Sequence, residues 1–128
     1  MRGLRIGDVL VVRLPEHRPP GHEQMGRRPA VVVGLPDLVG PPRFPVVLVA
    51  PMTTVTGPWV RAAPDLYPLL ERGEGNLPRR SVVLLDQIRA VDALRVEGWI
   101  GRLPKDRMRQ IRRTIARVFG VDEGNRIL

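Results

Sequence analysis

The segment GHEQMGRRPA, residues 21–30, gathers a histidine, a glutamate, a glutamine and two arginines directly before a run of valines. An imidazole and a carboxylate can move protons, and a guanidinium presents a planar fork of donors that matches a phosphate. Arg28 precedes a proline, which biases its backbone toward the extended conformation and places it where a loop meets a strand. The segment therefore holds groups suited to proton transfer and phosphate binding, although Arg28 could equally be an ordinary charge at a strand end.

Four apolar segments predict the strands that must support this chemistry, at residues 8–14, 29–34, 44–52 and 81–91. The connections between them are rich in proline and glycine. At the C-terminal end the period changes, and a helix is predicted from apolar residues at helical spacing, namely Met108, Ile111, Ile115 and Val118. We therefore expect a mainly β fold with α structure, in which the helix packs on a small, strongly bent antiparallel sheet or barrel.

Length and composition bound the organisation of the chain. Its 128 residues fit one domain, expected over residues 1–120, with a flexible tail at 121–128. No stretch is apolar enough for a membrane span or a signal-peptide core, so a cytoplasmic protein is predicted. The formal net charge of +8 favours a polyanionic partner such as RNA, DNA or an acidic peptide. The absence of cysteine excludes thiol nucleophiles and thiolate zinc sites.

Metal and cofactor sites find little support in the sequence. A metal site built from His17, His22 and Glu23 is conceivable, but all of them belong to one loop that is expected to be mobile. No glycine-rich phosphate loop with a lysine is present, so we predict neither a metal nor a cofactor. Trp59 and Trp99 could stack on nucleobases, but a role in the core or at a dimer interface is favoured because aromatic residues are few.

Four blocks, GDVLVV, GHEQMGRRPAVVV, VLVAPMTT and SVVLLDQIRAVD, follow one another in an order that resembles the MazF/PemK family of toxin endoribonucleases. The resemblance covers nearly the whole chain and is weakest at residues 57–80 and after residue 119. It implies a small SH3-like barrel of the CcdB/PemK type with a C-terminal helix, usually a homodimer. It also implies the toxin of a type II toxin–antitoxin system, which cleaves single-stranded RNA at specific sequences without a metal and leaves a 2′,3′-cyclic phosphate and a 5′-hydroxyl. The implied partner is a cognate MazE-like antitoxin, generally an acidic, extended peptide at its inhibitory end.

The resemblance further implies a set of site residues. The family's loop arginine corresponds to Arg28, its catalytic threonine to Thr53, and the acid–amide pair of the loop to Glu23 and Gln24. Arg28 and Thr53 would stabilise the negative charge that develops when an RNA 2′-hydroxyl attacks the neighbouring phosphate. Thr54 is kept as a reserve candidate, because the alternation of side chains along the strand could fail at Pro51, where a bulge would turn Thr54 to the other face.

The general base stays open between two residues of the loop. Glu23 supplies a carboxylate, and His22 supplies an imidazole, the side chain best suited to proton transfer near neutral pH. Many family members carry serine at the position of His22, so such a role would not be general; a loop residue that contacts RNA is the alternative.

The block SVVLLDQIRAVD predicts further contacts to the substrate. Strict alternation would place Gln87 and Arg89 on one face of a strand. Because this motif borders the substrate groove in the resembling family, Gln87 would read a base edge and Arg89 would bind a phosphate. Asp86 falls on a mostly apolar face, where a structural role in satisfying backbone groups is favoured.

Two other functions are compatible with the same fold. One is a non-catalytic toxin that binds a protein partner, as gyrase-poisoning relatives do; these depend on a C-terminal Trp-Gly-Ile, whereas this chain ends in NRIL. The other is an RNA-binding regulator that has lost activity. The matched arginine, threonine, glutamate and glutamine are all present, so the endoribonuclease is favoured.

Overall fold

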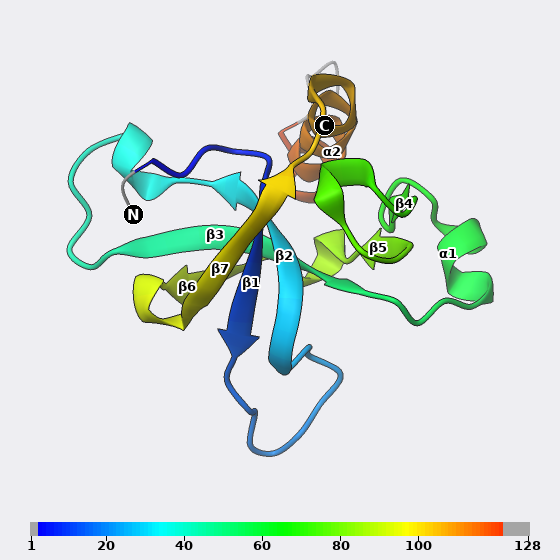
Figure 1. Cartoon of the computed structure of the whole chain (residues 1–128), viewed down its shortest axis with the longest axis horizontal. Coiled ribbons are helices and arrows are strands. Elements are labelled where there is room, and N and C mark those ends of the chain that lie inside the picture. Colours follow the sequence, from blue (N-terminus) through cyan, green and yellow to red (C-terminus); the bar gives the residue numbers. More distant parts are fainter. Residues whose placement is uncertain (1–2, 122–128) are drawn as a thin grey trace.

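The computed structural model describes residues 3–121, in which short strands and tight turns precede one long helix (Figure 1). Seven strands form an antiparallel sheet in the order β4–β5–β3–β2–β1–β7, with β6 paired to β3. The strands are β1 (Asp8–Leu14), β2 (Gly26–Gly34), β3 (Val46–Thr53), β4 (Leu69–Leu70), β5 (Ser81–Val83), β6 (Arg89–Asp92) and β7 (Val96–Arg102). The helices are α1 (Pro58–Ala62) and α2 (Lys105–Val118), and four 3-10 turns are η1 (Pro36–Leu38), η2 (Glu74–Asn76), η3 (Leu85–Gln87) and η4 (Ala93–Arg95).

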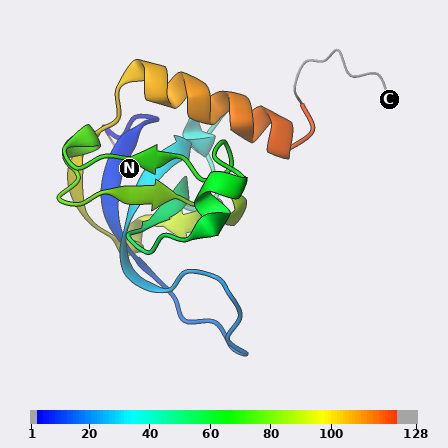
Figure 2. The same ribbon diagram turned by 90° about the vertical axis from the view of Figure 1, so that its right-hand side faces the viewer.

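The sheet curls because its central strand, β3, pairs with three other strands and because two of its ladders contain register shifts. The N-terminal half of β3 pairs with β6, its C-terminal end pairs with β5, and β2 runs along its other edge. The β1–β7 and β2–β3 ladders each contain register shifts, which bend strands and increase twist. The predicted mainly β fold, a strongly bent antiparallel sheet with a C-terminal helix, is confirmed. Figures 1 and 2 show the loop between β1 and β2 projecting at the opposite end of the molecule from α2.

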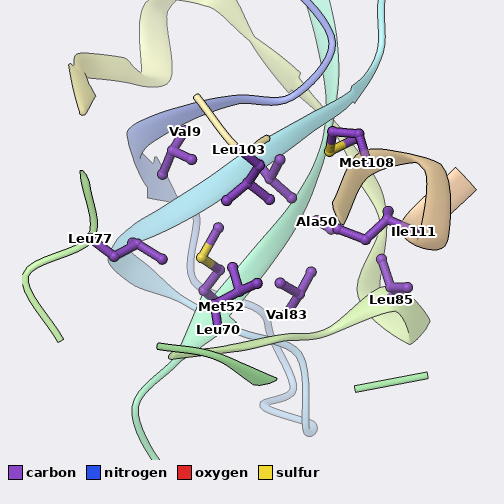
Figure 3. Packing of buried hydrophobic residues seen from close by; sticks show 11 residues of the cluster. Val9, Ala50, Met52, Leu70, Leu77, Val83, Leu85, Leu103, Met108 and Ile111 are labelled. Carbon is purple, nitrogen blue, oxygen red and sulfur yellow. The ribbon is translucent and has the colours of Figure 1, made fainter. Parts of the chain in front are cut away.

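The main core lies between the sheet and α2 (Figure 3). Met108 and Ile111 of α2 pack into a cluster with Val9, Ala50 and Met52 of the sheet. Complete burial of a side chain such as Ile111 contributes about 1.5–3 kcal/mol, so these contacts are what fixes the helix on the sheet.

The ends of α2 match the sequence, whereas one residue of its apolar stripe does not. Pro104 is the N-cap, and Gly120, at φ 73°, follows the C-cap in the left-handed conformation that glycine adopts most readily. Val118, predicted to pack, is 49% exposed, and Thr114 at 7% exposure takes the place on the buried face. Of the predicted tail at residues 121–128, all but Val121 lies outside the described residues.

Several predicted strand boundaries are wrong. The strand predicted at residues 8–14 has its expected bounds, but β2 begins at Gly26 rather than at residue 29, and β3 covers residues 46–53 rather than 44–52. Arg28 therefore lies inside β2, opposite Val12 of β1, and not at the strand's end. The edge strand β7 was not predicted, because its glycines and charged residues dilute the apolar pattern.

The prediction of one continuous strand over residues 81–91 is also wrong. The segment divides into β5, the turn η3 and β6, so that residues 84–88 lie opposite only Ala50 and Pro51 of β3. Pro51 has no N–H to donate to a ladder; its carbonyl accepts from Leu84 N at 2.9 Å, and the chain then turns. The expected common face of Gln87 and Arg89 therefore does not exist as a strand face.

An ion pair holds α2 to the connection after β4. The Arg107 guanidinium donates to both carboxylate oxygens of Glu74, at 2.8 and 3.0 Å, and to the Leu69 carbonyl at 3.2 Å. The hydrogen bonds from Arg107 hold the pKa of Glu74 below its ordinary value of 4.5. The stabilisation is therefore present above pH 4.5 and is lost as the pH falls through the lowered pKa.

Glu74→Gln is expected to lower the free energy of unfolding by about 1 kcal/mol at neutral pH, since it removes a charge-assisted bond. The difference from wild type should shrink as the pH is lowered from neutral to below the lowered pKa of Glu74, where the carboxyl is protonated in both states. Denaturant unfolding at both pH values measures this. Glu71→Gln is the matched control, because the Glu71–Arg80 pair is well exposed and should contribute little. An equal loss for Glu74→Gln at both pH values would contradict the assignment.

Within residues 3–121, helices are too short or too polar to cross a membrane.

Candidate active site

A cavity of about 490 Å³ opens between the start of β2, the end of β3, α1 and η3. It is lined by His22, Gln24, Arg28, Thr53, Val55, Trp59, Tyr67, Leu84, Asp86 and Gln87. Five of the predicted site residues are therefore brought together: Arg28, Thr53, His22, Gln24 and Gln87.

The orientation of the Arg28 side chain is fixed by a hydrogen bond to a backbone carbonyl and by the place of Arg28 in strand β2. It sits in β2 between its neighbours β1 and β3, and its Nε donates to the Met25 carbonyl at 3.0 Å. This bond leaves the N–H groups of both terminal nitrogens available, and in the described part of the chain Arg28 forms no ion pair. The preceding residue differs in this respect, since Arg27 donates to Glu97 at 2.8 Å. Arg28 thus presents an uncompensated, oriented guanidinium to the cavity.

Thr53 is the last residue of β3 and is 7% exposed. Its Oγ1 accepts a hydrogen bond from Val55 N at 3.1 Å, which leaves the hydroxyl proton free to be donated into the cavity. Thr54 lies beyond the strand, is exposed, and does not line the cavity. The geometry thus favours Thr53 over Thr54 as the donor next to Arg28.

Gln87 fixes the loop that covers one side of the cavity. Its Oε1 accepts from Gln24 N at 2.8 Å, and its Nε2 donates to the His22 carbonyl at 3.3 Å. Both polar atoms of Gln87 are thus used to hold the loop rather than left free for a base edge. The Gln24 Oε1 atom is buried, and it finds no hydrogen-bond partner among residues 3–121. Such an acceptor is what an N–H or O–H of a bound molecule would satisfy.

Gln87→Leu is expected to loosen the loop and to lower catalytic efficiency about five- to tenfold, since roughly one net hydrogen-bond energy is lost. Hydrogen exchange at residues 22–25 should accelerate while exchange in β1 and β3 stays unchanged. Gln87→Glu, which keeps the acceptor for Gln24 N, should retain part of the protection. Unchanged exchange in Gln87→Leu would show that the loop is held by other contacts.

Three predicted site residues lie outside the cavity. Glu23 is exposed, and its carboxylate folds over Gly21, where an added Cβ would come within 2.7 Å of Oε1. Thr54, the second of these residues, is exposed beyond the end of β3. Arg89, the third, places Nη1 at 3.1 Å from Nε2 of His17, so it contacts the loop from β6. Among residues 3–121, His17, His22 and Glu23 do not gather into a group that could hold a metal ion.

Asp86, Tyr67 and Trp59 also reach the cavity. The sequence favoured a structural role for Asp86 and a core or dimer-interface role over base stacking for Trp59, and it gave no signal for Tyr67. The Tyr67 hydroxyl donates to Asp86 Oδ2 at 2.7 Å, so Asp86 bonds a side chain rather than the backbone groups that were expected. This hydrogen bond, with burial, raises the pKa of Tyr67 and keeps its phenol protonated. A sequence signal existed for Asp86, because it directly precedes Gln87 in the DQIR block. The assumed strand alternation placed its side chain on the face opposite to that of Gln87.

The fold and the site together define a small, mainly β protein. Its curled antiparallel sheet is covered by a C-terminal helix, and a polar cavity is lined by an arginine of β2 and a threonine of β3. The family model described as "PemK-like, MazF-like toxin of type II toxin-antitoxin system" matches residues 5–119. The chain belongs to this family.

Individual relatives agree with this assignment. Over 88 residues, covering 69% of this chain and 74% of the relative, the chain is 38% identical to the protein named "Probable endoribonuclease MazF5" of Mycobacterium tuberculosis. Over 112 residues, covering 88% of each, it is 30% identical to "Endoribonuclease MazF" of Staphylococcus saprophyticus. A solved endoribonuclease in complex with its cognate antitoxin, from a mycobacterial species, has the same fold with a TM-score of 0.66 at 16% identity, covering 97% of this chain and 100% of that one.

Proposed function

We propose that this protein is an endoribonuclease toxin that cleaves single-stranded RNA without a metal ion. The observation that carries the proposal is Arg28, whose guanidinium is oriented by the Met25 carbonyl, is left without an acidic partner in residues 3–121, and shares a cavity with Thr53. A cationic fork and a hydroxyl donor converging in a sheltered cavity suit the charge that accumulates on a phosphate under attack. Cleavage of RNA is also the activity named for both relatives, one of them as a probable endoribonuclease.

In the proposed reaction the RNA 2′-oxygen attacks the adjacent phosphorus and the bond from phosphorus to the 5′-oxygen breaks. The products are a 2′,3′-cyclic phosphate and a 5′-hydroxyl, so no water enters this step. Arg28 holds the non-bridging oxygens, and Thr53 donates a further hydrogen bond to them. Each contact becomes stronger as negative charge develops, which is the condition for accelerating the step.

Proton transfer is assigned to a titratable group within the cavity. His22 and Asp86 both line it, whereas Glu23 does not. A guanidinium remains protonated, so Arg28 is not a candidate. The base takes the proton of the 2′-hydroxyl, and the leaving 5′-oxygen gains one.

We further propose a homodimer that acts in the cytoplasm and is neutralised by a MazE-like antitoxin. One structural neighbour is described with a cognate antitoxin, and the net charge of +8 suits both an acidic antitoxin segment and RNA. RNA and antitoxin would then compete for the basic surface around the cavity.

The test is incubation of the purified protein with a long, mostly unstructured RNA in EDTA, followed by mapping of the fragments. Discrete cuts at a short recurring sequence are expected, and an added acidic antitoxin should suppress them. RNA that stays intact with a folded protein would contradict the proposed activity and would point to a non-catalytic toxin that binds a protein.

A further inference from the structure

Two aromatic residues that contact each other line the cavity. Trp59 of α1 and Tyr67 lie with ring centroids 4.9 Å apart and planes at 88°. Both are half-buried, and both pack on the cluster formed by Val60, Val82 and Leu84. The hydroxyl of Tyr67 is tied to Asp86, so its ring is fixed at both ends. The pair is therefore a rigid, perpendicular corner that lines a cavity.

The lining of the cavity combines two kinds of group. Arg28 and Thr53 supply positive charge and a donor, whereas the aromatic corner is bonded through Tyr67 to Asp86, an exposed carboxylate that forms no ion pair within residues 3–121. A phosphate would be repelled by Asp86 and attracted by Arg28. A neutral planar ring would gain contact with the aromatic corner and suffer no such repulsion. Phosphate and base of one nucleotide therefore have separate places in the same cavity.

We propose that the Trp59–Tyr67 corner is a stacking subsite for one unpaired nucleobase of the RNA, next to the phosphate that Arg28 holds. The inference rests on the proposed function and adds a substrate-binding element to it. The cavity volume of about 490 Å³ lies within the range of small-molecule sites, roughly 300–1,000 Å³. A base stacked on one ring presents its edge to the face of the other, an arrangement that aromatic groups favour.

Stacking on such a corner tolerates every base, because each base has an aromatic face. The subsite is thus expected to supply affinity and position rather than sequence discrimination. The motif at which RNA is cut should stay the same when the corner is weakened, while the rate of cutting falls.

Tryptophan fluorescence tests the contact without relying on activity. The chain has two tryptophans, and Trp99, on β7 and 58% exposed, can be changed to phenylalanine so that Trp59 is the sole reporter. The probe is a fluorescein-labelled RNA carrying the mapped cut motif, with a 2′-deoxy nucleotide at the cut so that the attacking hydroxyl is missing. Binding is followed by anisotropy of the label and stacking by quenching of Trp59. A parallel series replaces one nucleotide at a time with an abasic residue.

We expect the labelled RNA to quench Trp59 fluorescence in a saturable manner. The quenching should vanish when the nucleotide at one position flanking the cut is replaced with an abasic residue. Anisotropy that reports binding, with no quenching of Trp59 for any probe, would overturn the subsite while leaving the endoribonuclease intact. Absence of cleavage and of binding by the wild-type protein would instead overturn the proposed function on which the subsite depends.

Kinetics provide an independent readout. Trp59→Leu is expected to lower kcat/KM roughly 10- to 100-fold, the loss of one base–aromatic contact, with an unchanged cut motif. Trp59→Phe keeps a ring and should remain within about threefold of wild type. If the leucine variant fails to fold, the phenylalanine variant and the quenching experiment still decide. A Trp59→Leu protein that is folded and fully active would contradict the proposal.

Discussion

Replacing Arg28 with alanine is expected to abolish detectable RNA cleavage while the fold remains intact. Arg28 is half-buried in β2, its side chain forms a single hydrogen bond among residues 3–121, to the Met25 carbonyl, and it lies outside both of the large core clusters, so its loss removes little packing. Loss of one preorganised donor to developing charge costs roughly 10²–10³ in rate, and a guanidinium supplies more than one donor and a full charge. Gel assays of RNA cleavage by a protein with wild-type thermal unfolding measure the effect.

The neighbouring arginine supplies a matched control. Arg27→Ala removes the same charge from the same strand, but Arg27 is exposed and bonded to Glu97, so cleavage should stay within about threefold of wild type. Arg28→Lys keeps the charge and loses the planar fork, and we expect intermediate activity. Equal losses in the Arg27 and Arg28 variants would indicate a general effect of charge on RNA binding rather than a specific phosphate contact.

Thr53→Ala should slow cleavage by roughly 10²-fold, the second largest effect, because a donor to the phosphate disappears. The hydroxyl also accepts from Val55 N, but Val55 is 65% exposed and water can satisfy that N–H, so stability should change little. Thr53→Ser keeps the hydroxyl and should retain most activity. Single-turnover cleavage rates separate this loss from weaker RNA binding.

Thr54→Ala is the control for register, since Thr54 is exposed and outside the cavity. It should cleave at the wild-type rate. If Thr54→Ala were inactive and Thr53→Ala active, the end of β3 would have to be placed one residue differently in the reacting complex.

The parts of the fold that follow from regular patterns were predictable from the sequence. The β-branched run of β1 and the 3.6-residue period of α2, with Gly120 at its end, are local signals, and both elements are found where they were expected. The placement of Arg28, Thr53 and Gln24 around one cavity was anticipated through the family resemblance, and His22 was proposed from its side-chain chemistry; their roles remain predictions.

What could not be predicted depends on contacts between distant segments. The edge strand β7 is defined by pairing with β1 and contains Gly98 and Gly101, so its own sequence hardly indicates a strand. The turn η3 arises where Pro51 of β3 cannot extend a ladder, which is invisible within residues 81–91. Asp86 and Trp59 reach the cavity because of that turn and of α1. Period-two reasoning fails at such a break, because it assumes a continuous strand.

The chemistry of the fragment ends tests the central claim most directly. RNA cut by the wild-type protein in EDTA should carry 2′,3′-cyclic phosphates and 5′-hydroxyls, and a single 2′-deoxy nucleotide at the cut position should block cleavage there. This result would mean that the RNA's own 2′-oxygen is the nucleophile, as Arg28 and Thr53 around one phosphate imply. Fragments with 3′-hydroxyl and 5′-phosphate ends, or cleavage that appears only when a divalent metal is added, would contradict it.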